Sequence, residues 1–479
     1  MSLLKKSLDL TAVNLSQQIL NLLFIFLISH QYTSAQYADY RQTFLPFEVA
    51  SPLLTFSLPA AIFYFYPRFS DKSKLLTLSL HVIALTTFVA GIIIFCGGAK
   101  WLSSLFDNEI SDYLYLIPFF AFFSIGTTVY QSFLVLSNKT SLLYRINLPI
   151  NFVSICLLLL CTYLKINIEY LIYLRILTYC VNFLLLTFFI FKSFSYNFFN
   201  VDTKSYKTII GFSYSLTLAA IIGTLSYELD KIIISSYDSP ENFAIYINGA
   251  FEIPMISILT GAVSSAMLSQ LSPLLNENKY KEAASLFKNT ISLTAQFIIP
   301  IFIFSLFNSE EIILLLFGDK YLDSILPFRI YLLLLPIRVI FYGQALIALG
   351  KSKIILKRGV IELIINLILS LILFKIIGFN GVAIATVITI LIWTVPFNLY
   401  EIKRGFGVKI LEIIPLKKIG NTMLISGIIY IPTTLLINEL VTSLLLGFII
   451  KLIIGCGLYI LVLKKFNLIN YTALGNKLS

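Results

Sequence analysis

Charged residues are scarce in this chain of 479 residues. Asp, Glu, Lys and Arg together make up 12% of it and hydrophobic residues 58%, whereas ordinary soluble domains are about 25% charged. The mean hydropathy is +0.90. A soluble core cannot bury so large an apolar share, so the composition excludes a soluble globular protein and predicts that lipid is the solvent.

Residues for catalysis and metal binding are also few. The chain has two histidines, His30 and His81, and its five cysteines lie in apolar runs without a CxxC pair. It contains no GxxxxGK[ST] loop and no Ser/His/Asp or Cys/His set. We therefore expect no metal, disulfide framework, ATP hydrolysis or cofactor, and a protein that is not an enzyme.

The apolar residues form blocks of about 20, the length that an α-helix needs to cross a bilayer. Apolar runs such as 361–377 are not interrupted by a polar side chain at every other residue, which argues against the alternating strands of a membrane barrel. We predict an all-α polytopic membrane protein with about fourteen transmembrane helices. The candidate spans are 11–30, 43–66, 76–98, 112–136, 142–164, 168–191, 208–235, 241–272, 288–317, 325–349, 355–377, 381–402, 415–437 and 441–463.

The connections between these spans are short and differ in charge. Alternate loops place about 25 of the basic residues on one side, which the positive-inside rule assigns to the cytosol together with both termini. The net charge of +11 then follows from topology, and nucleic acid is not expected as a partner. We interpret Lys451, near the middle of the last span, as a side chain that extends toward the interface.

An internal repeat divides the chain. Ala38-Asp39-Tyr40 precedes the second span and Ala244-Ile245-Tyr246 precedes the eighth, at an offset of about 206 residues. We predict a lobe of six helices at 1–200, a second at 201–407, and an appendage of two spans at 408–479. Since six is even, both lobes have the same orientation in the membrane, and we expect them to be pseudo-symmetric around a central cavity.

Several short motifs at span ends together resemble a known family. They are 40–68, Asp230-Lys231-Ile232-Ile233-Ile234, 316–321 (LFGDKY), 348–352 (ALGKS) and 378–386 (GFNGVAIAT). Their order and spacing are similar to those of bacterial polysaccharide exporters, specifically the O-antigen and capsule repeat-unit flippases of the multidrug/oligosaccharidyl-lipid/polysaccharide superfamily.

This resemblance implies a flippase of the bacterial inner membrane. Its substrate would be an undecaprenyl-diphosphate-linked oligosaccharide, moved from the cytoplasmic to the periplasmic leaflet by alternating access of the two lobes. The implied partners are this substrate, membrane lipids, a polysaccharide polymerase and a chain-length regulator.

Polar and cationic groups inside spans are the candidates for substrate binding, because a diphosphate and its sugars need a polar path across the membrane. One polar stripe on the first span consists of Asn14, Gln17 or Gln18, and Asn21, and it either lines a cavity or makes hydrogen bonds between helices. Arg175 and Arg338 suit a diphosphate, or pair with carboxylates of neighbouring helices.

Three further cations have open roles. Lys231 either contacts substrate or pairs with nearby acids. Arg41 is either a gate or an interface anchor, and Arg145 either attracts the diphosphate or only obeys the positive-inside rule.

Four embedded carboxylates are candidates for ion coupling with H⁺ or Na⁺. Glu48, Glu228 and Asp230 are the first three, although Lys231 offers the last two a local ion pair. Glu252 has no base nearby in the sequence and precedes Pro254, which can break the helix and expose backbone carbonyls to a cation.

Other classes of protein remain open at this point. A drug/cation antiporter of the same superfamily would share the fold and the carboxylates, but the embedded cations favour an anionic cargo. A polytopic glycosyltransferase or polymerase would need a sizeable catalytic loop, and no predicted loop exceeds about 15 residues. A non-transporting scaffold would leave the polar stripe of the first span unexplained.

Overall fold

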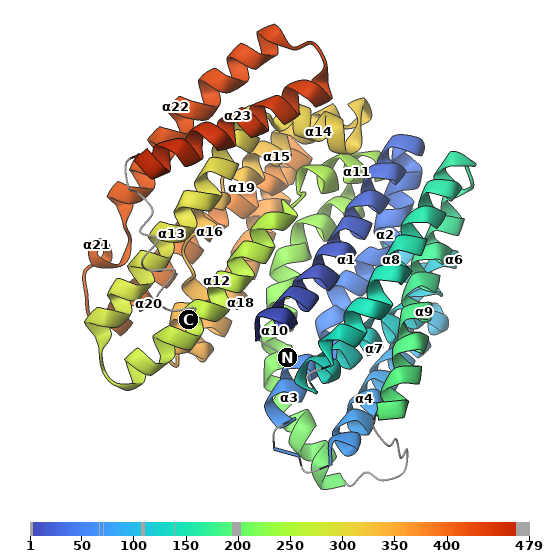
Figure 1. Ribbon diagram of the computed structural model, residues 1–479. Coiled ribbons are helices and arrows are strands. Elements are labelled where there is room, and N and C mark those ends of the chain that lie inside the picture. Colours follow the sequence, from blue (N-terminus) through green and yellow to red (C-terminus); the bar gives the residue numbers. More distant parts are fainter. Residues whose placement is uncertain are drawn as a thin grey trace. The chain divides into compact units, whose positions relative to one another are not determined.

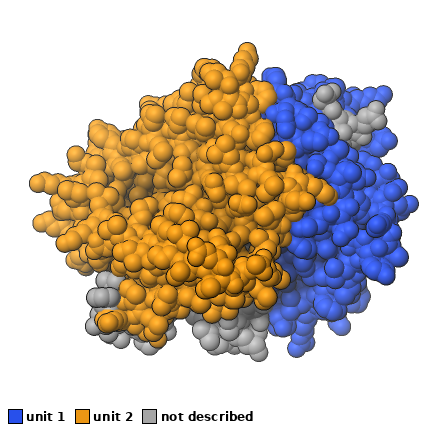
Figure 2. Space-filling model, turned by 90° about the horizontal axis from the view of Figure 1, so that it is seen from above, with its two compact units in different colours: residues 1–244 blue, residues 245–479 orange. Residues whose placement is uncertain are grey.

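The computed structural model describes residues 3–66, 68–69, 71–106, 111–137, 139–193 and 203–465, and every regular element in these ranges is a helix. Contacts divide the chain into two compact units, 1–244 and 245–479, coloured separately in Figure 2. The division falls inside one helix, α11 (Pro240–Gly249). The predicted lobe boundaries at 200 and 407 rest on the repeat and stay a prediction.

Unit 1 is a bundle of long helices (Figure 1). Its elements are α1 (Leu3–Gln31), α2 (Ser34–Thr55), α3 (Leu58–Phe65), α4 (Lys72–Ile93), a π-helical turn (Ile94–Gly98), α5 (Ala99–Leu105), α6 (Ser111–Leu114), α7 (Ile117–Leu136), α8 (Thr140–Tyr163), α9 (Ile168–Ser193) and α10 (Thr203–Tyr237).

Local sequence sets where these helices begin. Thr33 caps α2 in a reciprocal pair with Gln36, in which the Gln36 N–H donates to Thr33 Oγ1 at 3.2 Å and the Thr33 N–H to Gln36 Oε1 at 3.1 Å. Asp71 caps α4 by accepting from the Ser73 N–H at 2.9 Å. Both caps satisfy N–H groups that the first helical turn leaves without partners.

Polar bonds between helices add to the packing of unit 1. The Gln42 amide donates to Ser235 Oγ at 2.9 Å and joins α2 to α10, while the Asn182 amide donates to Asn147 Oδ1 at 2.6 Å and joins α9 to α8. Lipid supplies no hydrophobic force between helices, so close packing and such bonds hold a membrane bundle together.

Unit 2 contains more interrupted helices. Its elements after α11 are α12 (Pro254–Asn276), α13 (Tyr280–Phe307), α14 (Ser309–Phe317), a 3-10 turn (Asp319–Ser324), α15 (Ile325–Leu332), α16 (Leu335–Arg338), α17 (Tyr342–Ala348), α18 (Ser352–Ile377), α19 (Phe379–Thr389), a π-helical turn (Ile390–Thr394), α20 (Val395–Phe406), α21 (Ile410–Ile413), α22 (Leu416–Leu440) and α23 (Leu444–Lys465).

Twelve helices in the described ranges are long and apolar enough to cross a membrane, so the chain is a multi-pass membrane protein. The remaining two predicted spans, 11–30 and 241–272, coincide with α1 and with the broken pair α11 and α12. The all-helical membrane fold is confirmed, and the count of fourteen stays a prediction.

The internal repeat is visible in the helix boundaries. α11 begins at Pro240, 206 residues after α2 begins at Ser34. The first residues of α13 and α18 follow those of α4 and α8 by 208 and 212 residues. The same order of helices therefore occurs twice in the chain.

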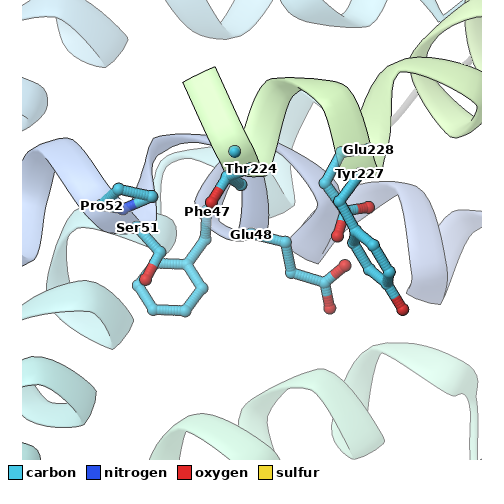
Figure 3. Close-up of a pocket in the computed structure, with 8 residues that line it drawn as sticks. Phe47, Glu48, Ser51, Pro52, Thr224, Tyr227 and Glu228 are labelled. Atoms are coloured by element: carbon cyan, nitrogen blue, oxygen red, sulfur yellow. The ribbon is translucent and has the colours of Figure 1, made fainter. Parts of the chain in front are cut away.

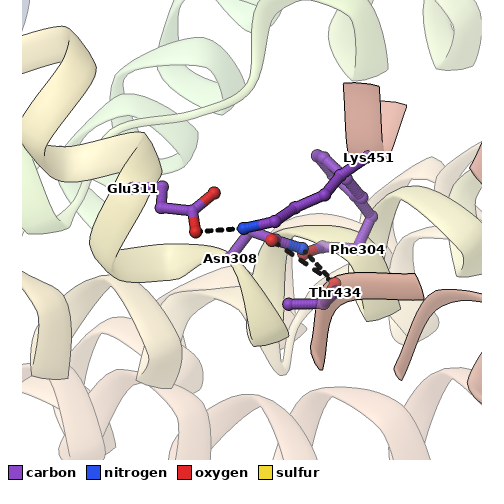
Figure 4. Close-up of polar contacts among 5 residues, drawn as sticks. All are labelled: Phe304, Asn308, Glu311, Thr434 and Lys451. Carbon is purple, nitrogen blue, oxygen red and sulfur yellow. Dashed lines mark hydrogen bonds and ion pairs between the residues drawn. The ribbon is translucent and has the colours of Figure 1, made fainter. Parts of the chain in front are cut away.

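The last two helices are attached to unit 2 by a buried polar cluster (Figure 4). Lys451 of α23 forms an ion pair with Glu311 of α14, and its side chain is only 2% exposed. The Asn308 amide donates to Thr434 Oγ1 of α22 at 3.2 Å. The interpretation that Lys451 extends to the interface is therefore wrong, because a carboxylate 140 residues away in the sequence neutralises it inside the unit.

Candidate functional site

One face of α2 carries two charged residues, Arg41 and Glu48. Tyr37, Arg41, Phe44 and Glu48 follow at intervals of four, three and four residues, which aligns them along the helix. Arg41 Nη1 donates to the Tyr37 hydroxyl at 3.2 Å. The helical period thus places a guanidinium and a carboxylate about two turns apart on one surface.

Arg175 of α9 joins this face from the neighbouring helix. Its Nη1 donates to the Tyr40 hydroxyl at 3.0 Å, and its guanidinium carbon lies 4.2 Å from the centre of the Phe44 ring. Phe120 of α7 also faces this guanidinium, at 5.8 Å. Aromatic faces attract a cation that has left water, so the rings offset part of the cost of burying Arg175.

Arg41 and Arg175 can each bind a further anionic partner. In the part of the chain that the structure describes, no carboxylate lies within 4.0 Å of Arg41 or Arg175, and the buried Nε of Arg175 has no hydrogen-bond partner. Glu48 acts on both only at longer range. The cluster therefore carries an excess positive charge and an unused donor, as a site for an anion requires.

A pocket of about 380 Å³ lies beside this cluster, between α2 and α10. Figure 3 shows Glu48 of α2 beside Tyr227 and Glu228 of α10. The residues that line the pocket are Phe47, Glu48, Ser51, Pro52, Gly223, Thr224, Tyr227 and Glu228.

The acids of α10 are tied to a neighbouring base. Lys231 Nζ binds Glu228 Oε2 at 2.6 Å and lies 4.6 Å from the Tyr227 ring centre, while Asp230 accepts from the Lys231 backbone N–H at 2.8 Å. The predicted local ion pair is thus present. Glu48 has no such pair among the described residues but is within electrostatic range of both Glu228 and Lys231.

Unit 2 brings together two residues that the sequence analysis assigned to different roles. Glu252 lies in the break between α11 and α12, and Arg338 ends α16 before the break that precedes α17. They form an ion pair, with side chains 31% and 35% exposed respectively. Glu252 has no local base, as expected, because its base comes from a helix 86 residues further along.

The remaining predicted residues are dispersed. On α1, Gln18 is half-buried and Asn21 exposed, while the side chain of Asn14 lies outside the described residues. Gln17, in the same stripe, donates to the Tyr179 hydroxyl of α9 at 3.3 Å. Part of this stripe therefore makes the hydrogen bonds between helices that were left open as its alternative role.

Arg145 and Arg358 lie near the starts of α8 and α18, the helices that correspond in the repeat. Arg145 is exposed. Arg358 instead pairs with Glu362 at 3.5 Å and donates to Asn398 at 3.4 Å.

Sequence reasoning missed the aromatic partners of the arginines. Tyr37 is detectable, because it precedes Arg41 by one helical turn. Tyr40 and Phe120 carry no such signal, since they reach Arg175 from elements distant in the sequence.

The fold and these polar positions define a class of helical, multi-pass membrane proteins with broken helices and charged groups inside the spans. Residues 69–326 match the model of a family described as polysaccharide biosynthesis proteins, and the chain belongs to this family. The predicted resemblance to a family of polysaccharide biosynthesis is thereby confirmed.

Curated relatives match part of the chain. A probable low-salt glycan biosynthesis flippase of Haloferax volcanii is 27% identical over 40% of this chain and 41% of the relative. A putative O-antigen transporter of Shigella flexneri is 28% identical over 40% and 45%, and a capsular polysaccharide biosynthesis protein of Staphylococcus aureus 24% identical over 43% and 53%. The chain spans about half the length of the curated relatives it matches.

Solved structures extend the likeness to the whole fold. A lipid II flippase, MurJ, in an inward closed conformation has a TM-score of 0.75 and 19% identity, over 96% of this chain and 98% of that chain. An inward-facing multidrug resistance transporter of the MATE family has a TM-score of 0.66 and 13% identity, over 82% and 95%. At these identities the likeness shows that the chain shares the fold of these transporters.

Proposed function

We propose that this protein is a flippase that moves an undecaprenyl-diphosphate-linked oligosaccharide from the cytoplasmic to the periplasmic leaflet of a bacterial inner membrane. Membership of the polysaccharide biosynthesis family supports a glycan cargo. The relatives described as a glycan flippase and an O-antigen transporter support a transport role for this chain. Both termini then face the cytoplasm, and polymerase and chain-length regulator act on the same product.

The observation that carries this proposal is the pair Arg41 and Arg175. Neither has a carboxylate within ion-pair distance among the described residues, and Arg175 retains a buried donor. A guanidinium in this state is costly in a membrane unless an anion compensates it during the cycle. A diphosphate supplies that anion and accepts forked hydrogen bonds from arginine.

One tyrosine near these arginines suits the sugar part of the cargo. Tyr37 and Tyr40, which contact Arg41 and Arg175, are buried, whereas Tyr227 lines the adjacent pocket and is 50% exposed. Aromatic side chains with a hydroxyl offer an apolar face and a hydrogen-bonding edge, as sugar recognition requires.

Glu48 is our candidate for coupling to H⁺ or Na⁺. It lies within electrostatic range of the arginine cluster and of Lys231, and it lines the pocket beside Glu228. Neutralising Glu48 leaves the arginines more positive and raises their attraction for a diphosphate. Ion binding and cargo binding at this face then influence one another, as alternating access driven by a gradient requires.

Reconstituted protein tests the proposal directly. Fluorescent undecaprenyl-diphosphate oligosaccharide is followed between the leaflets of proteoliposomes, with and without an imposed proton or sodium gradient. We expect movement that the protein catalyses and that one of the gradients accelerates. Failure to move any such lipid, together with export of a cationic dye, would instead identify a drug antiporter.

A further inference from the structure

A second cleft lies in unit 2, away from the charged face of α2. Its volume is about 520 Å³, and it is bounded by the turn between α12 and α13 and by the turn between α20 and α21. Figure 1 shows α20 and α21 at one end of this unit. It is lined by Asn278, Lys279, Tyr280, Lys281, Glu282, Phe406, Gly407 and Val408.

Basic side chains surround this cleft. Lys281 in its wall is exposed, and so are Lys403, Arg404 and Lys409 next to its other wall. Glu277 accepts a hydrogen bond from Lys279 at 2.6 Å, which raises the pKa of Lys279 and offsets its charge. Segments 277–282 and 403–418 together hold seven basic and three acidic residues, including the exposed Glu282 in the cleft wall, so the net local charge attracts anions.

Exposed leucines lie beside these bases. Leu411 and Leu416 are 66% and 55% exposed, whereas Ile413, two residues after Leu411, is fully buried. Lys288 Nζ donates to the Leu411 carbonyl at 2.8 Å and fixes α21 against α13. The short helix thus presents an apolar side chain outward, between basic residues, as segments at the edge of a bilayer do.

We propose that this cleft binds the phosphate headgroup of an anionic phospholipid of the adjacent leaflet, with the acyl chains along Leu411 and Leu416. Lys281 and Lys409 supply the positive charge. The topology expected from the sequence places both turns on the cytosolic side, where anionic lipids attract basic segments next to spans. An acidic protein segment would match the charge but would leave the exposed leucines without a role.

General attraction between a basic loop and an anionic membrane is the alternative to a specific site. The two differ in which lysines matter. Lys353 and Lys357 are exposed basic residues at the start of α18, on neither of the two turns that bound the cleft, whereas Lys281 lines it and Lys409 directly follows its lining residue Val408. A specific site depends on Lys281 and Lys409 and not on this second pair, whereas general attraction depends equally on both pairs.

Native mass spectrometry of the purified full chain with phosphatidylglycerol or phosphatidylcholine decides between them. We expect one phosphatidylglycerol molecule to be held in preference to phosphatidylcholine. The double variant K281Q/K409Q should weaken this binding roughly 30-fold, at about one kcal/mol for each basic residue near the surface, while K353Q/K357Q should leave it unchanged.

Three outcomes would overturn the proposal. They are equal binding of both lipids by the wild type, equal losses in the two double variants, and binding of glycerol phosphate as tight as that of the lipid. The variant L411S/L416S keeps every lysine and should weaken lipid binding alone. Because lipid binding is measured without transport, its result is independent of the flippase assay.

Discussion

Arg175 is the residue on which the assignment of the anion site depends most. Its guanidinium lies against Phe44 and Tyr40, with a buried Nε free of partners among the described residues. We expect Arg175→Gln to slow flipping roughly 10- to 100-fold, since a hydrogen bond to a charged group contributes about 1.5–3 kcal/mol. The measurement is the initial rate of lipid flipping in proteoliposomes that contain the variant or the wild type.

A matched control separates cargo binding from loss of charge. Arg145→Gln removes one positive charge from an exposed position and should leave the rate unchanged. Wild-type rates in Arg175→Gln would refute the site on α2, and a normal melting temperature of the variant would exclude simple misfolding as the cause of a loss.

Glu252 and Arg338 form the next residue-scale test. Their side chains are each about a third exposed, so we expect a coupling energy of only about 1 kcal/mol in a double-mutant cycle of thermal stability. Glu252→Gln and Arg338→Ala should both insert into the membrane and both impair transport. If both single variants transport at the full rate, the pair is only structural.

At the scale of the element, hydropathy located most helices but not their interruptions. The predicted span 168–191 corresponds to α9 (Ile168–Ser193), and 415–437 to α22 (Leu416–Leu440). The predicted span 325–349 is instead divided into α15, α16 and α17. The length of an apolar segment predicts whether it can span a membrane. A break in its helix depends on which neighbouring residues pair with the backbone groups that the break leaves without partners.

Pairings between elements were still harder to foresee. The break before Pro254 was expected from the proline itself. The contact of Arg175 with Tyr40 joins residues 135 positions apart, and that of Lys451 with Glu311 residues 140 apart. One sequence shows which residues are costly to bury but not which distant residue compensates them.

The ion pair of Lys451 with Glu311 makes α23 dependent on α14. Lys451→Ala leaves Glu311, whose side chain is 16% exposed, without its cation, and we expect a loss of roughly 3–5 kcal/mol in unfolding free energy. Lys451→Met with Glu311→Leu should recover most of it, because no charge is left buried. Lys464→Ala, at the exposed end of α23, is the control, and an equal loss there would contradict the assignment.

Close packing of α22 and α23 rests on a glycine. A Cβ at Gly455 would lie 2.4 Å from Cε1 of Tyr430, whereas a Cβ at Gly457 would meet no atom within 4 Å. Gly455→Ala should therefore destabilise the protein by about 1–3 kcal/mol, and Gly457→Ala should not, since alanine favours the helix. The melting temperatures of the two variants are measured by thermal unfolding in detergent, and equal values would exclude the predicted clash.

At the scale of the whole molecule, the proposed function requires that cargo and ion influence one another. Glu48 is the group best placed for this, since it acts electrostatically on both arginines and on the Glu228–Lys231 pair. Glu48→Gln fixes the neutral state that a bound proton would produce. We expect the variant to bind the diphosphate lipid at least as tightly as the wild type, because its two arginines lose an opposing charge.

Transport by this variant should then no longer respond to the gradient. Lipid flipping in proteoliposomes, measured with and without an imposed proton or sodium gradient, should proceed in Glu48→Gln at one rate under both conditions, while the wild type is accelerated. Acceleration that survives in Glu48→Gln but is lost in Glu252→Gln would move the coupling site to unit 2 and leave the arginine site intact. Loss of flipping in Glu48→Gln under every condition, with normal lipid binding, would instead show that protonation of this carboxylate traps one conformation, because the cycle needs both of its charge states.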